Sequence, residues 1–158
     1  MGHGSWGHSI YPDPVRLYLV RHAEAAAGDP DALRPLTAKG RDQARDLGAR
    51  LAAEGAAGAA VLTSPLLRAR QTGELIARAL GTEPRPDERL APGATATSVR
   101  AAVIGHGDAV VAIGHQPDCG RVAAELTGGP EPLVPTAGLV VIELPAAGSG
   151  ADLGLEPG

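Results

Sequence analysis

The stretch LYLVRHAEA, residues 17–25, changes abruptly from apolar to polar side chains. Its first part, Leu17 to Val20, is a continuous apolar run of the kind that forms a buried strand. Arg21 and His22 follow directly, so both polar side chains would lie at the carboxyl end of that strand. Taken alone, this pair is compatible with a simple cap on the strand, and its meaning depends on what the rest of the chain brings to the same place.

Strand-like and helix-like segments alternate outward from this first strand. The patterns predict strands at 15–20, 59–63, 109–113 and 138–144, and helices at 37–55, 65–81, 97–105 and 121–128. Residues 82–94 contain three prolines and are expected to be mostly loop. The alternation predicts a single-domain α/β fold, a three-layer sandwich in which helices cover both faces of a largely parallel central sheet.

Local signals predict where the first helices begin and which faces they bury. Thr37 is a suitable N-cap and Gly55 a suitable end for the first helix. Helical spacing predicts buried stripes made of Ala44, Leu47, Leu51 and Ala52 in the first helix and of Leu67, Leu75, Ile76 and Leu80 in the second.

The two ends of the chain lack this periodicity. Residues 1–14 are rich in Gly, His and Pro and are expected to form a flexible extension, in which His3 and His8 could bind a metal only weakly. Residues 146–158 are expected to form a flexible tail. The folded domain is therefore predicted to span residues 15–145.

Composition narrows the classes of function. The 158 residues carry a net charge of −4, which argues against nucleic acid or an anionic membrane as the main partner. No apolar stretch reaches the roughly 20 residues of a spanning helix, and no secretory signal is expected at the N-terminus. With a single cysteine, no internal disulfide can form. A cytoplasmic monomer is the expectation.

Polar residues follow three of the predicted strands and define a candidate pocket. Arg21 and His22 follow the first strand, Ser64 and Arg68 the second, and His115 the strand at 109–113. The carboxyl ends of parallel strands meet at one edge of a sheet, so these groups should converge. Arginine forks suit phosphate oxygens, and helix N-termini near Pro65 and Pro117 would add their dipoles. The pattern predicts a phosphate pocket.

The histidines suggest what such a pocket could do. A neutral imidazole can attack phosphorus and divide phosphoryl transfer into two steps. His22 has a well-fixed backbone at the strand end, and His115 could donate a hydrogen bond to a phosphate oxygen. The arginines would supply the positive charge, and no cluster of ligands stands out, so neither a metal nor another cofactor is expected.

Four stretches together resemble a known family. LYLVRHAEA, RPLTAKGRDQA (34–44), VLTSPLLRARQT (61–72) and AIGHQP (112–117) are similar to the histidine phosphatase superfamily, the RHG-motif enzymes. The resemblance covers roughly residues 15–144 and implies a phosphoglycerate-mutase-like fold. The short length, RPLT and GHQP resemble the SixA-type phosphohistidine phosphatases most closely.

The resemblance implies roles for individual residues. His22 would be the transiently phosphorylated nucleophile, and Arg21, Arg68 and His115 would complete the phosphate pocket. Arg34, in RPLT, matches an arginine of SixA-type proteins that is expected near the pocket.

Two departures from the family pattern stand out. Ala23 stands where the motif usually has glycine. Larger members carry a glutamate as proton donor in the middle loop, where this chain reads DERLAPG. Glu88, Asp87, Glu24 or no residue at all could be the general acid.

A missing general acid bears on the substrate class. A protonated phosphohistidine expels neutral imidazole, whereas an alkoxide leaving group usually needs an acid. The predicted function is removal of phosphate from phosphohistidine in a protein partner. The alternatives are a phosphomonoesterase for a small phosphorylated metabolite, such as a sugar phosphate or nucleotide, and a non-catalytic phosphate-binding module. A mutase is disfavoured.

Other polar residues are given structural explanations. His106, in a second Ile-Gly-His sequence, should lie in a surface loop at the opposite end of its strand from His115. Cys119 is expected to be a buried, inert thiol, and Gln71 and Gln116 to make structural hydrogen bonds. Arg70 is expected to lie at the surface.

Overall fold

The central sheet contains five strands in the order β3–β2–β4–β1–β5. The computed structural model describes residues 14–145. The strands are β1 (Val15–Arg21), β2 (Ala60–Thr63), β3 (Pro84–Pro86), β4 (Ala109–Gly114) and β5 (Leu139–Leu144). β1, β2, β3 and β4 run parallel, and β5 pairs antiparallel with β1 at one edge. The largely parallel sheet is therefore confirmed.

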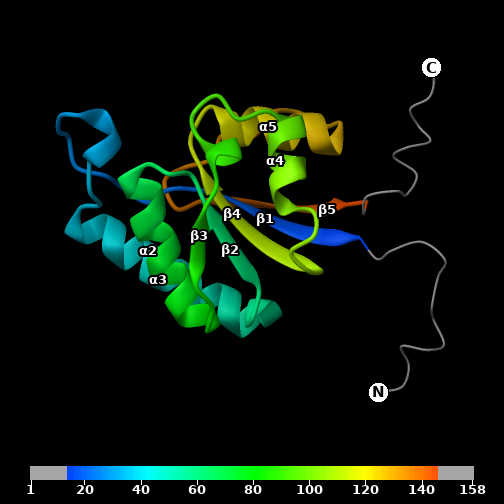
Figure 1. Cartoon of the computed structure of the whole chain (residues 1–158), viewed down its shortest axis with the longest axis horizontal. Helices are drawn as coiled ribbons and strands as arrows, with labels where there is room; N and C mark the ends of the chain where they lie inside the picture. The colour runs from blue at the N-terminus through cyan, green and yellow to red at the C-terminus, as the bar shows by residue number, and fades with distance from the viewer. Residues whose placement is uncertain (1–13, 146–158) are drawn as a thin grey trace.

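Two helices cover each face of the sheet, as Figure 1 shows. α2 (Ala38–Leu51) and α3 (Leu67–Leu80) pack together on one face, and α4 (Ala96–Val103) and α5 (Asp118–Thr127) cover the other. The strands face both layers because successive side chains point to opposite sides. In β1, Leu17 and Leu19 pack with α4 and α5, whereas Tyr18 and Val20 pack with α2 and α3. The predicted three-layer α/β sandwich is confirmed.

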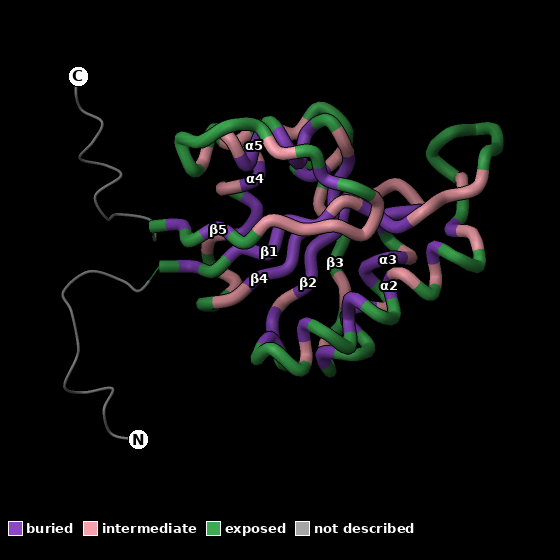
Figure 2. Tube along the Cα trace, turned by 180° about the vertical axis from the view of Figure 1, so that it is seen from behind, coloured by how far each residue is buried: buried purple, intermediate pink, exposed green. Residues whose placement is uncertain are grey.

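Figure 2 shows that the central strands β1, β2 and β4 are largely buried between the two layers of helices. Leu17, Val20, Val110 and Ile113 are all completely buried, and they belong to neighbouring strands. Because both faces are covered, these strands are continuous apolar runs rather than alternating ones.

The proline-rich stretch was predicted as mostly loop, and here the prediction was incomplete. Pro84–Pro86 forms the edge strand β3, and Glu88–Leu90 forms a short 3₁₀ turn (η3). Proline lacks a backbone N–H and is tolerated where only one side of a strand must be paired. β3 pairs with β2 alone, so its prolines do not interrupt a central ladder.

The start of α2 follows the predicted capping chemistry. The Gly40 N–H donates to the Thr37 side-chain oxygen at 2.9 Å. Gly40 also lies directly against the backbone of Glu24, so that a side chain at this position would overlap the Glu24 carbonyl. This close approach brings α2 against the segment that follows β1.

The buried face of α3 differs from the predicted stripe. Ile76 and Leu80 are buried as predicted, but Leu67 and Leu75 are only half-buried. The inward face instead includes small residues such as Ala69 and Gly73. A Cβ at Gly73 would overlap the Thr63 side chain, so small residues allow α3 to approach the sheet closely. Hydrophobic spacing alone overestimated the role of the leucines.

The remaining helix predictions agree with the structure to within a few residues. α2 passes at Ala52–Ala56 into a wider π-type turn (η2), in which Gly55 has a φ of 101°. No helix within residues 14–145 is long and apolar enough to cross a membrane. Nearly all of the predicted N-terminal extension, with His3 and His8, and all of the predicted C-terminal tail lie outside the described residues.

Candidate active site

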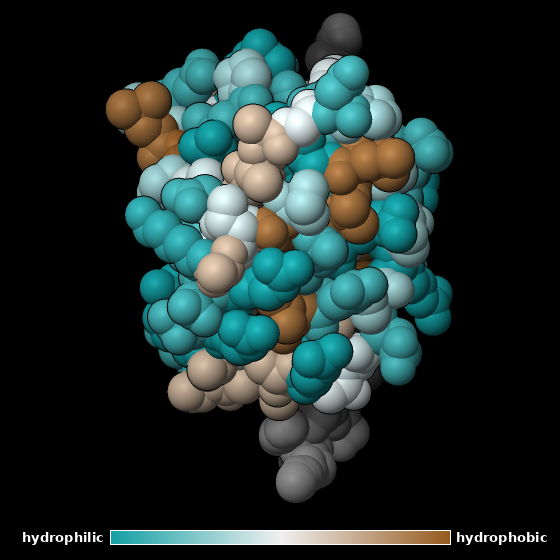
Figure 3. Space-filling model, turned by 90° about the vertical axis from the view of Figure 1, so that its left-hand side faces the viewer, coloured by the Kyte–Doolittle hydropathy of each residue, from teal (hydrophilic) through white to brown (hydrophobic). Residues whose placement is uncertain are grey.

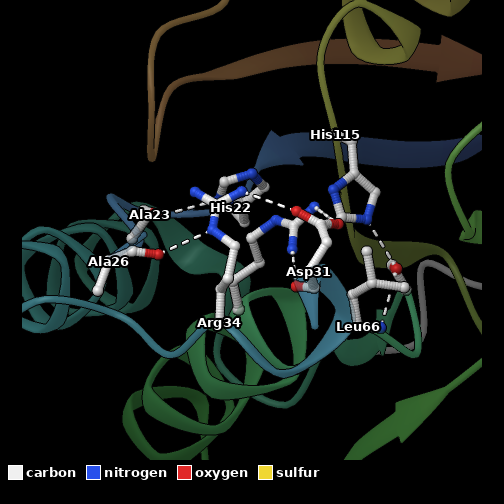
Figure 4. Close-up of polar contacts among 9 residues, drawn as sticks. His22, Ala23, Ala26, Asp31, Arg34, Leu66 and His115 are labelled. Atoms are coloured by element: carbon white, nitrogen blue, oxygen red, sulfur yellow. Dashed lines mark hydrogen bonds and ion pairs between the residues drawn. The ribbon is translucent and has the colours of Figure 1, made fainter. Parts of the chain in front are cut away.

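The carboxyl ends of three parallel strands bring the predicted site residues together. Arg21 in β1 lies beside Gly114 in β4, and Thr63 in β2 lies beside Ile113. The residues just beyond these positions, His22, Ser64 and His115, therefore meet at one edge of the sheet. The ring centroids of His22 and His115 are 5.3 Å apart, and both side chains are drawn in Figure 4.

His22 is held as a neutral imidazole with a defined tautomer. Its backbone N–H donates to the Gly114 carbonyl at 3.0 Å, and its side chain is buried. Ring Nδ1 lies 2.7 Å from the Ala23 carbonyl oxygen, which can only accept, so Nδ1 carries the proton. Burial, together with the nearby charges of Arg68 and Arg21, lowers the pKa of His22 to about 4. At neutral pH the Nε2 lone pair is therefore free.

His115 is fixed by a hydroxyl at the end of β2. Its Nε2 lies 2.8 Å from Ser64 Oγ, which also accepts a hydrogen bond from the Leu66 N–H at 3.2 Å. Burial, together with the positive charges of His22 when it is protonated and of Arg68, lowers the pKa of His115 to about 4. His115 is thus also neutral at pH 7, and its Nδ1 is not used in the bond to Ser64.

Two arginines supply the positive charge of the pocket. Arg21 donates through Nη1 to the Val134 carbonyl at 3.2 Å. Its Nε is buried and has no hydrogen-bond acceptor within residues 14–145. Arg68 is only 8% exposed and donates to Asp31, through Nη1 to the backbone carbonyl at 2.9 Å and through Nη2 to the carboxylate at 3.1 Å. A phosphate oxygen would supply the acceptor that Arg21 Nε lacks.

Arg34 is connected to the pocket through the same carboxylate. Its Nη1 donates to Asp31 Oδ1 at 2.9 Å, and its Nε donates to the Ala26 carbonyl at 2.8 Å. Its charge also contributes to the lowered pKa of His22. The structure therefore places Arg34 near His22, joined to Arg68 by Asp31.

Asp31 and Thr72 are residues that the sequence reasoning missed. Asp31 opens a short 3₁₀ turn (η1, Asp31–Leu33), and an acid three residues before an arginine is too common a pattern to single it out. Thr72 is completely buried, accepts the Ala23 N–H at 3.0 Å and donates to the Arg68 carbonyl at 2.8 Å. It thereby ties α3 to the segment after His22. Only the fold reveals this contact, because the residues are 49 positions apart.

The position where the family motif usually has glycine is compatible with alanine in this fold. Ala23 is completely buried, and its backbone N–H and carbonyl bond to Thr72 and His22. The methyl group belongs to a small apolar cluster with Leu36 and Ala44. The Ala23 backbone therefore still supports the His22 ring.

Each of the three candidate general acids either bonds to a group outside the pocket or is exposed to solvent. Glu24 accepts from the Thr37 hydroxyl at 2.9 Å and pairs with Lys39 at 3.7 Å. The Arg89 guanidinium lowers the pKa of Asp87, which keeps that carboxyl ionised. Glu88 is exposed. Within the described chain, none of the three forms a hydrogen bond or ion pair with the His22, Arg21, Arg68 and His115 side chains.

The residues predicted to have structural rather than catalytic roles have environments close to those predicted. Gln71 accepts from the Leu36 N–H, and Gln116 accepts from the Gly120 N–H, each at 2.8 Å. Cys119 is buried, and burial raises the pKa of its thiol to about 12, which keeps it protonated. His106 lies in the turn before β4, half-buried rather than fully at the surface, and Arg70 is exposed.

The described residues and their surface add two observations about the site. The part of the chain that the structure describes contains no group of three or more His, Cys, Asp or Glu side chains that could hold a metal ion. Figure 3 looks onto the left-hand side of Figure 1, where the segment after β1 protrudes. This surface is mainly hydrophilic, and its hydrophobic side chains are separated from one another. The side chains gathered at the site are arginines, imidazoles and the Asp31 carboxylate.

Comparisons with known proteins agree with this geometry. A family model described as the histidine phosphatase superfamily (branch 1) matches residues 17–92. Phosphohistidine phosphatase SixA of Escherichia coli K12 is 31% identical, over 86% of this chain and 89% of that protein. An uncharacterized protein of Picosynechococcus is 38% identical, over 73% of this chain and 74% of the relative.

The fold comparison gives the same result. The structure of the protein histidine phosphatase SixA complexed with tungstate superimposes with a TM-score of 0.73 at 30% identity, over 80% of this chain and 86% of the other. The chain belongs to the histidine phosphatase superfamily, and the family together with its SixA relatives identifies it as a phosphatase. Within that superfamily it is of the SixA type, with relatives of that kind in both the sequence and the fold comparisons.

Proposed function

We propose that this protein removes phosphate from phosphohistidine on a partner protein, through a phosphorylated His22. The observation that carries the proposal is the state of His22. It is neutral, its Nδ1–H is held by the Ala23 carbonyl, and its Nε2 is free beside two arginines and a second neutral histidine. A buried imidazole in this state is a nucleophile, and the surrounding groups match the three oxygens of a phosphoryl group.

In the first step, the Nε2 lone pair of His22 forms a bond to phosphorus. The bond between phosphorus and the substrate's ring nitrogen breaks, and its electron pair stays on that ring. Arg21, Arg68 and the His115 ring face the transferring oxygens and stabilise their charge. The substrate departs as neutral imidazole and retains the proton on its other nitrogen.

In the second step, water attacks the phosphorus of phospho-His22. The bond to Nε2 breaks, and His22 returns to the neutral form with its proton still on Nδ1. The attacking water loses one proton to solvent as inorganic phosphate forms. The first step transfers phosphorus between two imidazole nitrogens, and in both steps the departing group is a neutral imidazole, so neither step requires a strong acid in the pocket.

Phosphohistidine is favoured as substrate by the chemistry of its leaving group. The candidate acids Glu24, Asp87 and Glu88 contact other groups or solvent rather than the pocket. An alkyl phosphate would have to expel a strongly basic alkoxide without such help. The name of the E. coli relative points to the same substrate class.

The test is phosphate release from a phosphohistidine-bearing protein and from p-nitrophenyl phosphate. His22→Ala should lower both rates by about 10⁴-fold or more, the scale seen when a nucleophile is removed. His106→Ala is the matched control and should retain the wild-type rates, because His106 lies at the opposite end of β4. Phosphate trapped on the wild type in an acid-labile linkage, but not on the His22 variant, would identify the intermediate.

Other outcomes would lead to a different function. Turnover of p-nitrophenyl phosphate without turnover of phosphohistidine would indicate a phosphomonoesterase for small metabolites, which a panel of sugar phosphates and nucleotides would then define. Binding of phosphate without turnover of either substrate would indicate a binding module. The cytoplasmic location and the monomeric state stay predictions.

A further inference from the structure

The turn at Asp31 places a carboxylate against the phosphate pocket. One carboxylate oxygen accepts from Arg34 at 2.9 Å and the other from Arg68 at 3.1 Å. The backbone carbonyl of the same residue accepts from Arg68 at 2.9 Å. Figure 4 shows Asp31 between Arg34 and the ring of His115. An acidic residue is thus built into a site otherwise suited to anions.

Exposure indicates which side of the pocket this carboxylate occupies. The Asp31 side chain is 64% exposed, whereas the Arg68 side chain that it contacts is 8% exposed. The carboxylate therefore lies on the solvent side of the guanidinium. A group displaced in line by buried His22 must depart toward solvent, so an exposed carboxylate at the pocket is in a position to meet the leaving group.

The carboxylate is ionised at neutral pH. Hydrogen bonds from Arg34 and Arg68 lower the pKa of Asp31 below its ordinary value. A carboxylate in this state is unsuited to donate a proton to a leaving group. It can instead accept a hydrogen bond from a leaving group that carries an N–H, or repel one that departs as an anion.

We propose that Asp31 is a specificity-determining residue, whose carboxylate accepts a hydrogen bond from the substrate's phosphorylated imidazole and disfavours leaving groups that depart as anions. This inference rests on the proposed phosphohistidine phosphatase function and deepens it. It attributes the preference for phosphorus–nitrogen bonds to Asp31, as well as to the lack of a bond between the candidate general acids and the pocket.

The two substrate classes place opposite charges near Asp31. Protonated phosphoimidazole carries positive charge on its ring, and its free N–H must stay protonated until the phosphorus–nitrogen bond breaks and neutral imidazole departs. A carboxylate beside the ring stabilises that proton. When an ester bond breaks, the electron pair goes to oxygen and negative charge develops, which the same carboxylate opposes.

The test compares phosphoimidazole with p-nitrophenyl phosphate, which differ in leaving group and carry no protein docking surface. Asp31→Asn removes the charge but retains an oxygen that can accept from an arginine. Asp42→Asn is the matched control, because Asp42 is also an exposed aspartate paired with an arginine three residues away, at 3.1 Å. Inhibition by inorganic phosphate is measured in parallel, since phosphate requires Arg68 and has no leaving group.

Asp31→Asn should lower kcat/KM for phosphoimidazole roughly 10-fold, the scale of a lost hydrogen bond to a charged group. It should raise kcat/KM for p-nitrophenyl phosphate, because the charge that opposes the anionic leaving group is removed, without weakening inhibition by phosphate. Asp42→Asn should change none of these quantities.

An equal loss with both substrates, together with weaker inhibition by phosphate, would show that Asp31 only positions Arg68, and would overturn the inference. Unchanged kcat/KM for phosphoimidazole would overturn it as well. Failure of the proposed function is a separate result, because there the wild-type enzyme itself would not hydrolyse phosphoimidazole.

Discussion

The tripeptide Ile-Gly-His occurs twice in this chain, once before strand β4 and once at its end. In the first copy, Ile104 follows the last turn of α4, and Gly105 has a φ of 95°, which only glycine adopts without strain. His106 then lies half-buried in the turn that leads into β4. This copy serves to reverse the chain direction.

The second copy has a different environment. Ile113 and Gly114 belong to β4 itself, and His115 follows directly, 95% buried and 5.3 Å from the ring of His22. The carboxyl ends of β1 and β2 lie beside it and contribute Arg21 and Ser64. The comparison teaches that three identical residues acquire different chemistry from the end of the strand at which they lie.

The largest effect expected from this comparison is on catalysis. His115→Ala should lower kcat for phosphate release by about 10²–10³-fold, the cost of removing one donor to the transferring oxygens. His106→Ala should change kcat less than about twofold, in line with substitutions away from the site. Steady-state assays of both variants provide the measurement, and equal losses would show that the strand end does not distinguish the two histidines.

A second effect concerns the packing of α2 against the segment that follows β1. Gly40→Ala would push a methyl group into the Glu24 carbonyl, next to the pocket, and should lower the free energy of unfolding by about 1–3 kcal/mol. Gly129→Ala, whose Cβ would meet ordinary contacts, is the control and should have little effect. Urea denaturation measures both, and a Gly40 variant as stable as the control would contradict the close approach.

A third effect follows from the protonation states of the buried pair. The pKa of His115 is lowered to about 4, so between pH 6.5 and 4 the unfolded chain binds a proton that the folded chain does not. Stability should therefore fall as the pH is lowered through this window. Between pH 7 and pH 5, His115 should account for about 1–2 kcal/mol of the loss.

His115→Gln removes this titrating group and should lose correspondingly less stability over the same interval. Urea midpoints of the variant and of the wild type at the two pH values decide the matter. Identical losses in the two proteins would mean that His115 is not held neutral by its surroundings.

The smallest effect tests what orients His115 at its end of the strand. Ser64→Ala removes the oxygen that lies 2.8 Å from His115 Nε2 and should lower kcat by roughly 5-fold, the scale of one neutral hydrogen bond. Ser64→Thr should retain most of the activity if the hydroxyl is the group that matters. Losses as large as that of His115→Ala would instead show that Ser64 itself contacts the substrate.

Much of this architecture could be predicted from local patterns. The apolar runs at β1, β2, β4 and β5 and the Thr37 cap were visible because they depend on neighbouring residues. The edge strand β3 was missed because its prolines disfavour strands, and pairing with β2 outweighed that preference. Leu67 and Leu75 were misplaced because the sheet selects the smaller face of α3.

The residues of the candidate site also divide into those that local patterns could predict and those that they could not. His22, Arg21, Arg68 and His115 could be selected because each lies at or next to the start or end of a strand or helix, in short motifs along the chain. Thr72 and Asp31 could not, because their partners are 49 and 37 residues away and their own surroundings are ordinary.

The amino-acid sequence by itself therefore determined the order of the helices and of all strands but β3, the class of the fold and the polar residues at the strand ends. Those properties arise from periodicity and from short motifs, which are local. The tertiary structure alone decided the neutral state of His22 and His115, the carboxylate shared by Arg34 and Arg68, and the different environments of the two Ile-Gly-His copies. These depend on burial and on contacts between distant segments, which exist only after the chain has folded.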